Sequence, residues 1–100
     1  MIKYIQLLKS KKEDKRFEAR FFNINKEKIK SINFGLKNGS TFIDHKDTKI
    51  KDAWIARHQV RGTFNNPITP SSLAYHLLWN KPTLSASYDD FLKKFSLQKY

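Results

Sequence analysis

The chain has 100 residues, with 20 Lys and Arg against nine Asp and Glu, a formal net charge of +11, and no cysteine. This length suits a domain of ordinary size, so we expect residues 1–100 to form a single domain. The lack of cysteine excludes disulfides, thiolate zinc sites and cysteine catalysis. The sequence has no apolar run of about 18 residues, so no membrane-spanning helix is expected. Met1–Leu8 is too short and too interrupted to predict a signal peptide.

The charge is unevenly distributed along the chain. Residues 1–61 hold sixteen basic and seven acidic residues, whereas residues 62–100 hold four and two. A strongly basic segment before a nearly neutral one predicts that the first part binds a polyanion and that the second part packs against the first. The alternative is a lysine-rich surface that serves only solubility.

Three segments at the start of the chain have the pattern of β-strands. Ile2–Lys9 predicts the first, and a charged turn over Ser10–Lys15 follows it. Arg16–Phe22 predicts the second strand, because its residues alternate between two faces. Lys28–Leu36 predicts the third strand.

The dipeptide Asn38-Gly39 is typical of a two-residue β-hairpin turn, in which both central positions take positive φ. We therefore expect Thr41–Ile43 to return as a fourth strand. Residues 1–44 would then form a basic antiparallel meander of three or four strands.

Residues 45–100 predict three helices. The first begins at an N-cap, Asp47 or Asp44, and runs to about Val60, where Gly62 ends it. The second is predicted over Ser71–Trp79, because Thr69-Pro70 places a hydroxyl at the N-cap and a proline at the first helical position.

The third helix follows a corner at Pro82, since the residue before a proline is pushed out of the α region. Thr83 or Ser85 is its expected cap, and its apolar residues fall at helical spacing on one face. That face consists of Leu84, Tyr88, Phe91, Leu92 and Phe95. The predicted architecture is thus α+β, an N-terminal antiparallel meander followed by three helices, at least some of them packed on one sheet face.

Several short motifs lie between Lys15 and Phe95. They are Lys15-Arg16-Phe17-Glu18-Ala19, Phe34-Gly35, His45-Lys46-Asp47, Ile55-Ala56-Arg57-His58, Asn66-Pro67-Ile68-Thr69 and Leu78-Trp79-Asn80-Lys81-Pro82-Thr83-Leu84, followed by Ser87, Asp90 and Phe95. In this order they resemble a family of small basic proteins encoded by nucleocytoplasmic large DNA viruses. The resemblance implies a viral context and a fold, but no catalytic residue, since that family has no established activity. It also implies a place in the virion or the infected host cell, in the cytoplasm or the viral factory, and not secretion.

Dispersed cations are the candidate nucleic-acid contacts, because phosphates need many positive charges and no special spacing. On the sheet and the first helix they are Arg20, Lys28, Lys30, Lys37, Lys46, Lys49, Arg57 and Arg61. Arg20, Lys28 and Lys30 are expected to face the same solvent. Tyr4, Phe22 and Trp54, if exposed, would stack on single strands, and the alternative places these rings in the core.

Motifs for catalysis are weak in this sequence. His45-Lys46-Asp47 lacks the spacing of the phospholipase D signature, and a long predicted helix separates His45 from Asn66 and His76, where a histidine–asparagine–histidine nuclease has a compact hairpin. Ser72 and His76 lack a visible oxyanion hole. We therefore expect no enzyme, no cofactor and no metal site, and we keep the metal-dependent nuclease as a minor alternative.

The leading hypothesis is a non-enzymatic viral protein that binds nucleic acid, DNA more than RNA, or another polyanion, largely independently of sequence. Packaging in the virion is part of this hypothesis. The main alternative is a minor capsid or scaffold protein that contacts viral structural proteins through Trp79, Lys81 and Pro82. In a third interpretation, Trp79 and Leu84 only hold the last two helices together.

Overall fold

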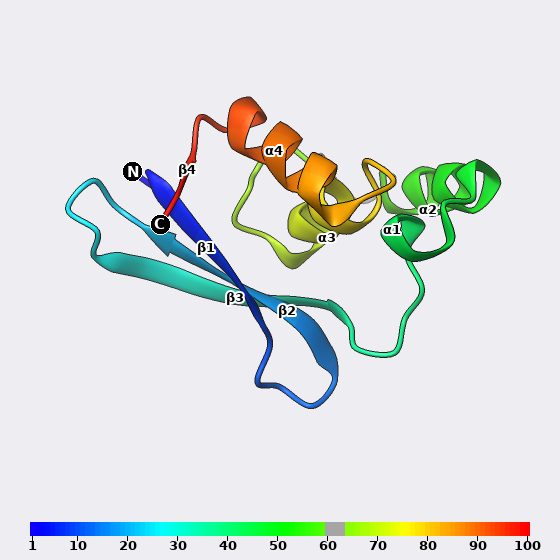
Figure 1. Cartoon of the computed structure of the whole chain (residues 1–100), viewed down its shortest axis with the longest axis horizontal. Helices are drawn as coiled ribbons and strands as arrows, with labels where there is room; N and C mark the ends of the chain where they lie inside the picture. Colours follow the sequence, from blue (N-terminus) through cyan, green and yellow to red (C-terminus); the bar gives the residue numbers. More distant parts are fainter. Residues whose placement is uncertain (60–63) are drawn as a thin grey trace.

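The structure of the protein is a computed structural model that describes residues 1–59 and 64–100 (Figure 1). The elements in chain order are β1 (Tyr4–Lys9), β2 (Lys15–Phe22), β3 (Lys28–Leu36), α1 (Phe42–His45), α2 (Thr48–Gln59), α3 (Pro70–Leu78), α4 (Leu84–Lys94) and β4 (Gln98–Lys99). The predicted α+β architecture is confirmed, since an antiparallel meander of β1, β2 and β3 precedes the helices.

All strands belong to one sheet with the order β3-β2-β1-β4. The last strand joins β1 in parallel orientation, so the end of the chain returns to its beginning (Figure 1). Across β2 and β3, Phe17 lies opposite Phe34 and Ala19 lies opposite Ile32. These residues share the face on which α3 and α4 pack, whereas α2 lies beyond the end of the sheet (Figure 1).

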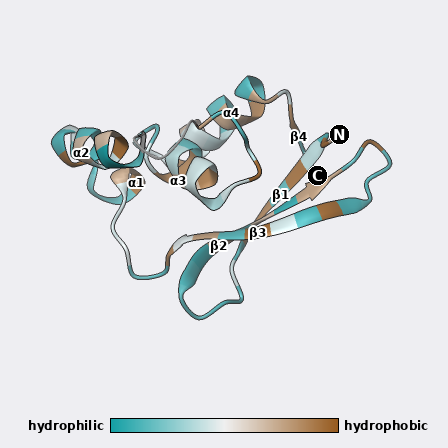
Figure 2. Cartoon of the chain, turned by 180° about the vertical axis from the view of Figure 1, so that it is seen from behind, coloured by the Kyte–Doolittle hydropathy of each residue, from teal (hydrophilic) through white to brown (hydrophobic). Residues whose placement is uncertain are grey.

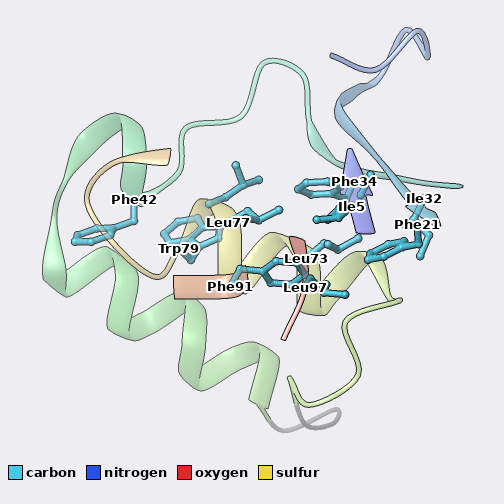
Figure 3. Close-up of a cluster of buried hydrophobic side chains, with 12 residues drawn as sticks. Ile5, Phe21, Ile32, Phe34, Phe42, Leu73, Leu77, Trp79, Phe91 and Leu97 are labelled. Atoms are coloured by element: carbon cyan, nitrogen blue, oxygen red, sulfur yellow. The ribbon is translucent and has the colours of Figure 1, made fainter. Parts of the chain in front are cut away.

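The hydrophobic core fills the space between this sheet face and the two helices (Figure 3). Phe21 and Phe34 from the strands, with Leu73, Leu77 and Phe91 from the helices, have no exposed surface. Each such side chain stabilises the fold by about 1.5–3 kcal/mol through its removal from water. The prediction that some helices pack on one sheet face is therefore confirmed for α3 and α4.

The predicted caps of the last two helices are confirmed. The hydroxyl of Thr69 accepts a hydrogen bond from the Ser72 N–H at 3.2 Å, and Pro70 takes the first helical position. Thr83, and not Ser85, caps α4, because its hydroxyl accepts from the Ala86 N–H at 3.1 Å.

The expected hairpin at Asn38-Gly39 is wrong. Gly39 does not take positive φ, and Thr41 is the N-cap of the short helix α1 instead of part of a returning strand. The carboxylate of Asp44 accepts hydrogen bonds from the Thr41 N–H and hydroxyl, each at 2.8 Å. This local cap favours the helix over the hairpin. Of the described glycines near this turn, Gly35 takes positive φ, at +76°.

Helix α1 also changes the number of helices from the expected three to four among the described residues. Of the two cap candidates, Asp47 caps α2, since its carboxylate accepts from the Lys49 N–H at 2.9 Å. The predicted end of this helix at Gly62 lies outside the described residues. No helix within the described ranges is long and apolar enough to cross a membrane.

Candidate nucleic-acid interface

The sheet register separates the cations that we predicted on the strands. Arg20 lies opposite Ser31, whereas Lys30 lies opposite Phe21. Because neighbouring residues of a strand point to opposite faces, Arg20 and Lys30 lie on different faces of the sheet, and the expected shared face was wrong for Lys30. Lys28 lies opposite Phe22, on the face of Arg20, because the register shifts between Phe21 and Phe22. Arg20 is further engaged by Glu18, with 3.0 Å between Nε and Oε2.

The predicted cations also divide between the two ends of the molecule. Lys28 begins β3, and Lys37 follows its last residue, which separates them by roughly 30 Å at about 3.3 Å per strand residue. Lys46, Lys49 and Arg57 are exposed on or before α2, beyond the Lys37 end of the sheet. Arg61 lies outside the described residues.

A cationic hollow of about 410 Å³ lies at the Lys37 end of the sheet. Its wall consists of Lys9, Ser10, Lys15, Arg16, Phe17 and Lys37, and we call it the basic hollow. The hairpin between β1 and β2, hydrophilic in Figure 2, pairs Lys9 with Phe17, and Lys15 lies two residues before Phe17 in the same wall. Lys15 also pairs with Leu36, the last residue of β3, and Lys37, which follows Leu36, lines the same hollow. Sequence reasoning had named only Lys37, because the other two depend on the strand register.

Arg16 differs from its lysine neighbours, because it is already bound. Its two terminal nitrogens donate to the two carboxylate oxygens of Asp44 at 2.7 and 2.9 Å. The Arg16 guanidinium holds the pKa of Asp44 well below its usual range, and the hydrogen bonds from Thr41 act in the same direction. Among the residues in the structure, no carboxylate lies within ion-pair distance of Lys9, Lys15 or Lys37. These three lysines are therefore available to an external anion.

A second cavity of about 360 Å³ adjoins the basic hollow and shares Lys15 with it. We call it the aromatic cleft, because Trp54, His58 and Trp79 form part of its wall. Residues from the end of β3 and from the loop before α1 complete the wall, together with residues of α3. These are Gly35, Leu36, Gly39, Ser40, Thr41, Ala74 and Leu78.

The rings of the aromatic cleft are nearly parallel. Trp54 and Trp79 have centroids 5.0 Å apart at an interplanar angle of 11°. His58 lies one turn after Trp54 and stacks on it at 3.9 Å and 15°. Trp79 is 6% exposed, whereas Trp54 and His58 are half-buried and present surface to the cleft.

Two contacts hold α2 in place. The ammonium of Lys51 donates to the Asn80 carbonyl at 2.7 Å, across to the corner between α3 and α4. The same ammonium lies 4.7 Å from the centroid of the Phe42 ring. Of the other stacking candidates, Phe22 is buried and stacks against Tyr100, and Tyr4 is half-buried.

The histidines and the serine considered for catalysis have local partners. Nε2 of His76 lies 2.7 Å from the Phe64 carbonyl, and the Ser72 hydroxyl donates to the same oxygen at 3.2 Å. Burial lowers the pKa of His76, and the bond to Phe64 partly opposes that shift. Nδ1 of His45 accepts from the Asp47 N–H at 2.9 Å. No cluster of three or more potential metal ligands exists in the parts of the chain that the structure describes.

The corner that we considered as a protein interface is divided between core and surface. Trp79 lies inside the molecule near Leu77 (Figure 3), whereas Lys81 and Pro82 are exposed. Ser87 closes the corner from within α4, since its hydroxyl accepts from the Lys81 N–H at 3.0 Å.

Fold and site together define a small basic α+β protein in which a cationic hollow opens beside an aromatic cleft. A family model described as a family of unknown function (DUF5754) matches residues 5–58, just over half of the chain, and the chain belongs to this family. The matched segment contains the whole basic hollow and the Trp54 and His58 side of the cleft. No curated protein and no solved structure matches the chain.

Proposed function

We propose that this protein binds nucleic acid without catalysing a reaction, and that its phosphate contacts centre on the basic hollow. The observation that supports this most is the convergence of Lys9, Lys15 and Lys37 on one hollow whose lining, among the described residues, holds no carboxylate. None of these lysines has a carboxylate within ion-pair distance in the described structure, and Glu13 and Asp14 border a different cavity with Lys37. Like charges held close together repel each other, and a bound polyanion relieves that repulsion.

The geometry favours binding that does not depend on base sequence. Lysine is a flexible point charge that contacts phosphate oxygens, whereas base reading relies on side chains that enter a groove of the duplex. Lys49 and Arg57 on α2 extend the positive surface beyond the hollow, and Arg20, Lys28 and Lys30 would be reached only by a longer strand. DNA is the preferred partner over RNA in this proposal.

The viral context and packaging in the virion belong to the same proposal. They rest on the motif resemblance described above and on the chemistry of the basic hollow. A basic protein that neutralises phosphates without regard to sequence suits the packaging of a genome.

The test compares two double variants of equal charge. Lys15→Gln with Lys37→Gln removes two cations from the basic hollow, and Lys28→Gln with Lys30→Gln removes two from the far end of the sheet. Binding to a fluorescent DNA duplex of about 20 base pairs is measured by anisotropy between about 50 and 200 mM salt. The unaltered protein should lose roughly 10³–10⁵-fold in affinity over that range if six to ten phosphates are engaged.

The slope of log K against log salt distinguishes the two variants. Each lost phosphate contact lowers the slope by about 0.9 for duplex DNA, so the hollow variant should lose about 1.8 and the control variant much less. Equal slopes for both variants would contradict the claim that the phosphate contacts centre on the basic hollow. An unaltered protein that fails to bind at low salt would refute the function itself and favour the capsid or scaffold alternative. Cleavage of DNA that requires a divalent metal and is lost in His45→Ala would favour the nuclease alternative.

A further inference from the structure

We propose that the aromatic cleft receives one unpaired nucleobase while the basic hollow holds a neighbouring phosphate, so that the protein prefers single-stranded over duplex nucleic acid. This inference rests on the proposed function and specifies its ligand. It assigns a role to Trp54, His58 and Lys15 that charge alone does not give them.

The volume and lining of the cleft suit a small planar ligand. Small-molecule sites usually enclose about 300–1,000 Å³, are mostly apolar and aromatic, and contain a few polar groups. The aromatic cleft has about 360 Å³, and Lys15 is its one charged lining residue in the described chain. Gly35 lets the end of β3 pack closely against α3 in the cleft wall, since a Cβ atom added there would lie 3.0 Å from Leu78 Cδ1.

Parallel rings favour a flat guest over a branched one. Trp54 lies within 15° of parallel to both Trp79 and His58, so the three rings share one stacking direction. The rings already stack on each other at 5.0 and 3.9 Å, so a base would extend this stack from an outer surface in the cleft and would not insert between the rings. Aliphatic side chains have no preferred plane, whereas every nucleobase has a π-face that stacks on such rings. The stack therefore selects for a base without selecting which base.

The position of Lys15 indicates that the bound base carries a negatively charged group. It borders the cleft and the basic hollow at once, and Lys9 and Lys37 line the hollow beyond it. A ligand that fills both spaces carries an aromatic ring next to a negative charge, which describes a nucleotide unit within a strand. An aromatic side chain of a protein partner would satisfy the cleft but leave these lysines unpaired.

A base in a duplex cannot enter a concave cleft without leaving its stack. Extruding a base from a duplex costs free energy, whereas a base in a single strand enters the cleft at a much lower free-energy cost. The walls come from α2, α3 and the loop before α1, which stand beside the end of the sheet (Figure 1). The cleft therefore favours flexible single strands.

Intrinsic fluorescence is the direct readout, because the chain contains two tryptophans and both line the cleft. The full-length protein is titrated at low salt with a 15-nucleotide thymidine oligonucleotide, with an abasic oligonucleotide of equal phosphate number, and with a duplex of equal length. We expect the first to quench the fluorescence and to bind roughly 5- to 150-fold more tightly than the abasic strand, the range given by stacking of one base.

A variant that blocks the cleft from its surface tests the inference without changing a residue of the hydrophobic core. Ser40 is exposed on the loop that lines the cleft, so Ser40→Leu should fill the entrance and abolish the preference for bases. Ser85→Leu, at an exposed position of α4 away from the cleft, is the matched control and should bind as the unaltered protein does.

The outcomes separate the two proposals. Salt-dependent binding of all three ligands with equal affinity and without quenching would overturn the base-binding cleft and leave nucleic-acid binding intact. Binding to none of them would overturn both. Quenching by an aromatic peptide with no response to the oligonucleotides would also overturn the inference, and would assign the cleft to a protein partner.

Discussion

Asp44→Asn tests the link between the strands and α1 most sharply, because one carboxylate serves two purposes there. It accepts from both terminal nitrogens of Arg16 at 2.7 and 2.9 Å, and from the Thr41 N–H and hydroxyl at 2.8 Å each. An asparagine keeps one acceptor oxygen and loses the charge. The substitution therefore weakens the cap of α1 and the ion pair together.

The magnitude follows from these two contributions. Loss of a helix cap costs about 1 kcal/mol. The Asp44 side chain is 36% exposed, so solvent screens the ion pair, and its loss costs only about 0.2–1 kcal/mol. A total of about 1–2 kcal/mol lowers the Tm of a domain of this size by roughly 4–16 °C. Thermal unfolding followed by circular dichroism measures this loss.

Asp47→Asn is the matched control for this measurement. Asp47 caps α2 through its carboxylate but makes no ion pair in the described structure, and asparagine is as good an N-cap as aspartate. We expect its Tm to stay near that of the unaltered protein. A Tm of Asp44→Asn equal to that of Asp47→Asn would refute the assignment of Asp44 as the link.

The pH dependence supplies a second check on Asp44. Its pKa in the folded protein is depressed, so its contribution is complete above the unfolded value of about 3.9 and is lost as the pH falls below it. The difference in Tm between the unaltered protein and Asp44→Asn should persist at pH 5 and shrink below about pH 4. A difference that does not change between pH 5 and pH 3 would contradict this cause.

Three further predictions concern the core and the backbone. Gly35→Ala should destabilise the fold by about 1–3 kcal/mol in urea unfolding, because Gly35 takes positive φ, whereas Gly39→Ala should cost clearly less. The unaltered protein should lose stability as the pH falls from 7 to 5, because burial lowers the pKa of His76 and the unfolded chain then binds the extra proton; His76→Gln should flatten that dependence. Phe91→Ala should cost about 3–5 kcal/mol by opening a cavity in the core, and a loss under 1 kcal/mol in the same assay would contradict the packing in Figure 3.

The elements that the sequence predicts correctly are those with local signals. Alternation predicts β2, and hydroxyl caps predict the beginnings of α3 and α4, since a cap acts on residues within one turn. The pattern at Asn38-Gly39 is local too, yet it fails. Contacts of Asp44 with Thr41 and with the distant Arg16 stabilise a helix there, and single-segment propensity does not include a partner 28 residues away.

The candidate site depends on long-range placement, and for that reason sequence reasoning found only part of it. Lys9 and Lys15 meet Lys37 only through the register of three strands. The cleft needs α2 to bring Trp54 against Trp79, although the two residues are far apart in the chain. The short strand β4 is likewise not visible in the sequence, because two residues suffice for it once backbone hydrogen bonds attach it to β1.

The most direct test of the account is a map of the bound strand on the protein. In a ¹H–¹⁵N spectrum of the full-length protein, addition of a short DNA single strand should shift the amide signals of Lys9, Lys15 and Lys37. It should leave those of Lys28 and Lys30 in place. Shifts confined to the start of β3, or no shifts at low salt, would contradict the claim that the basic hollow holds the phosphates.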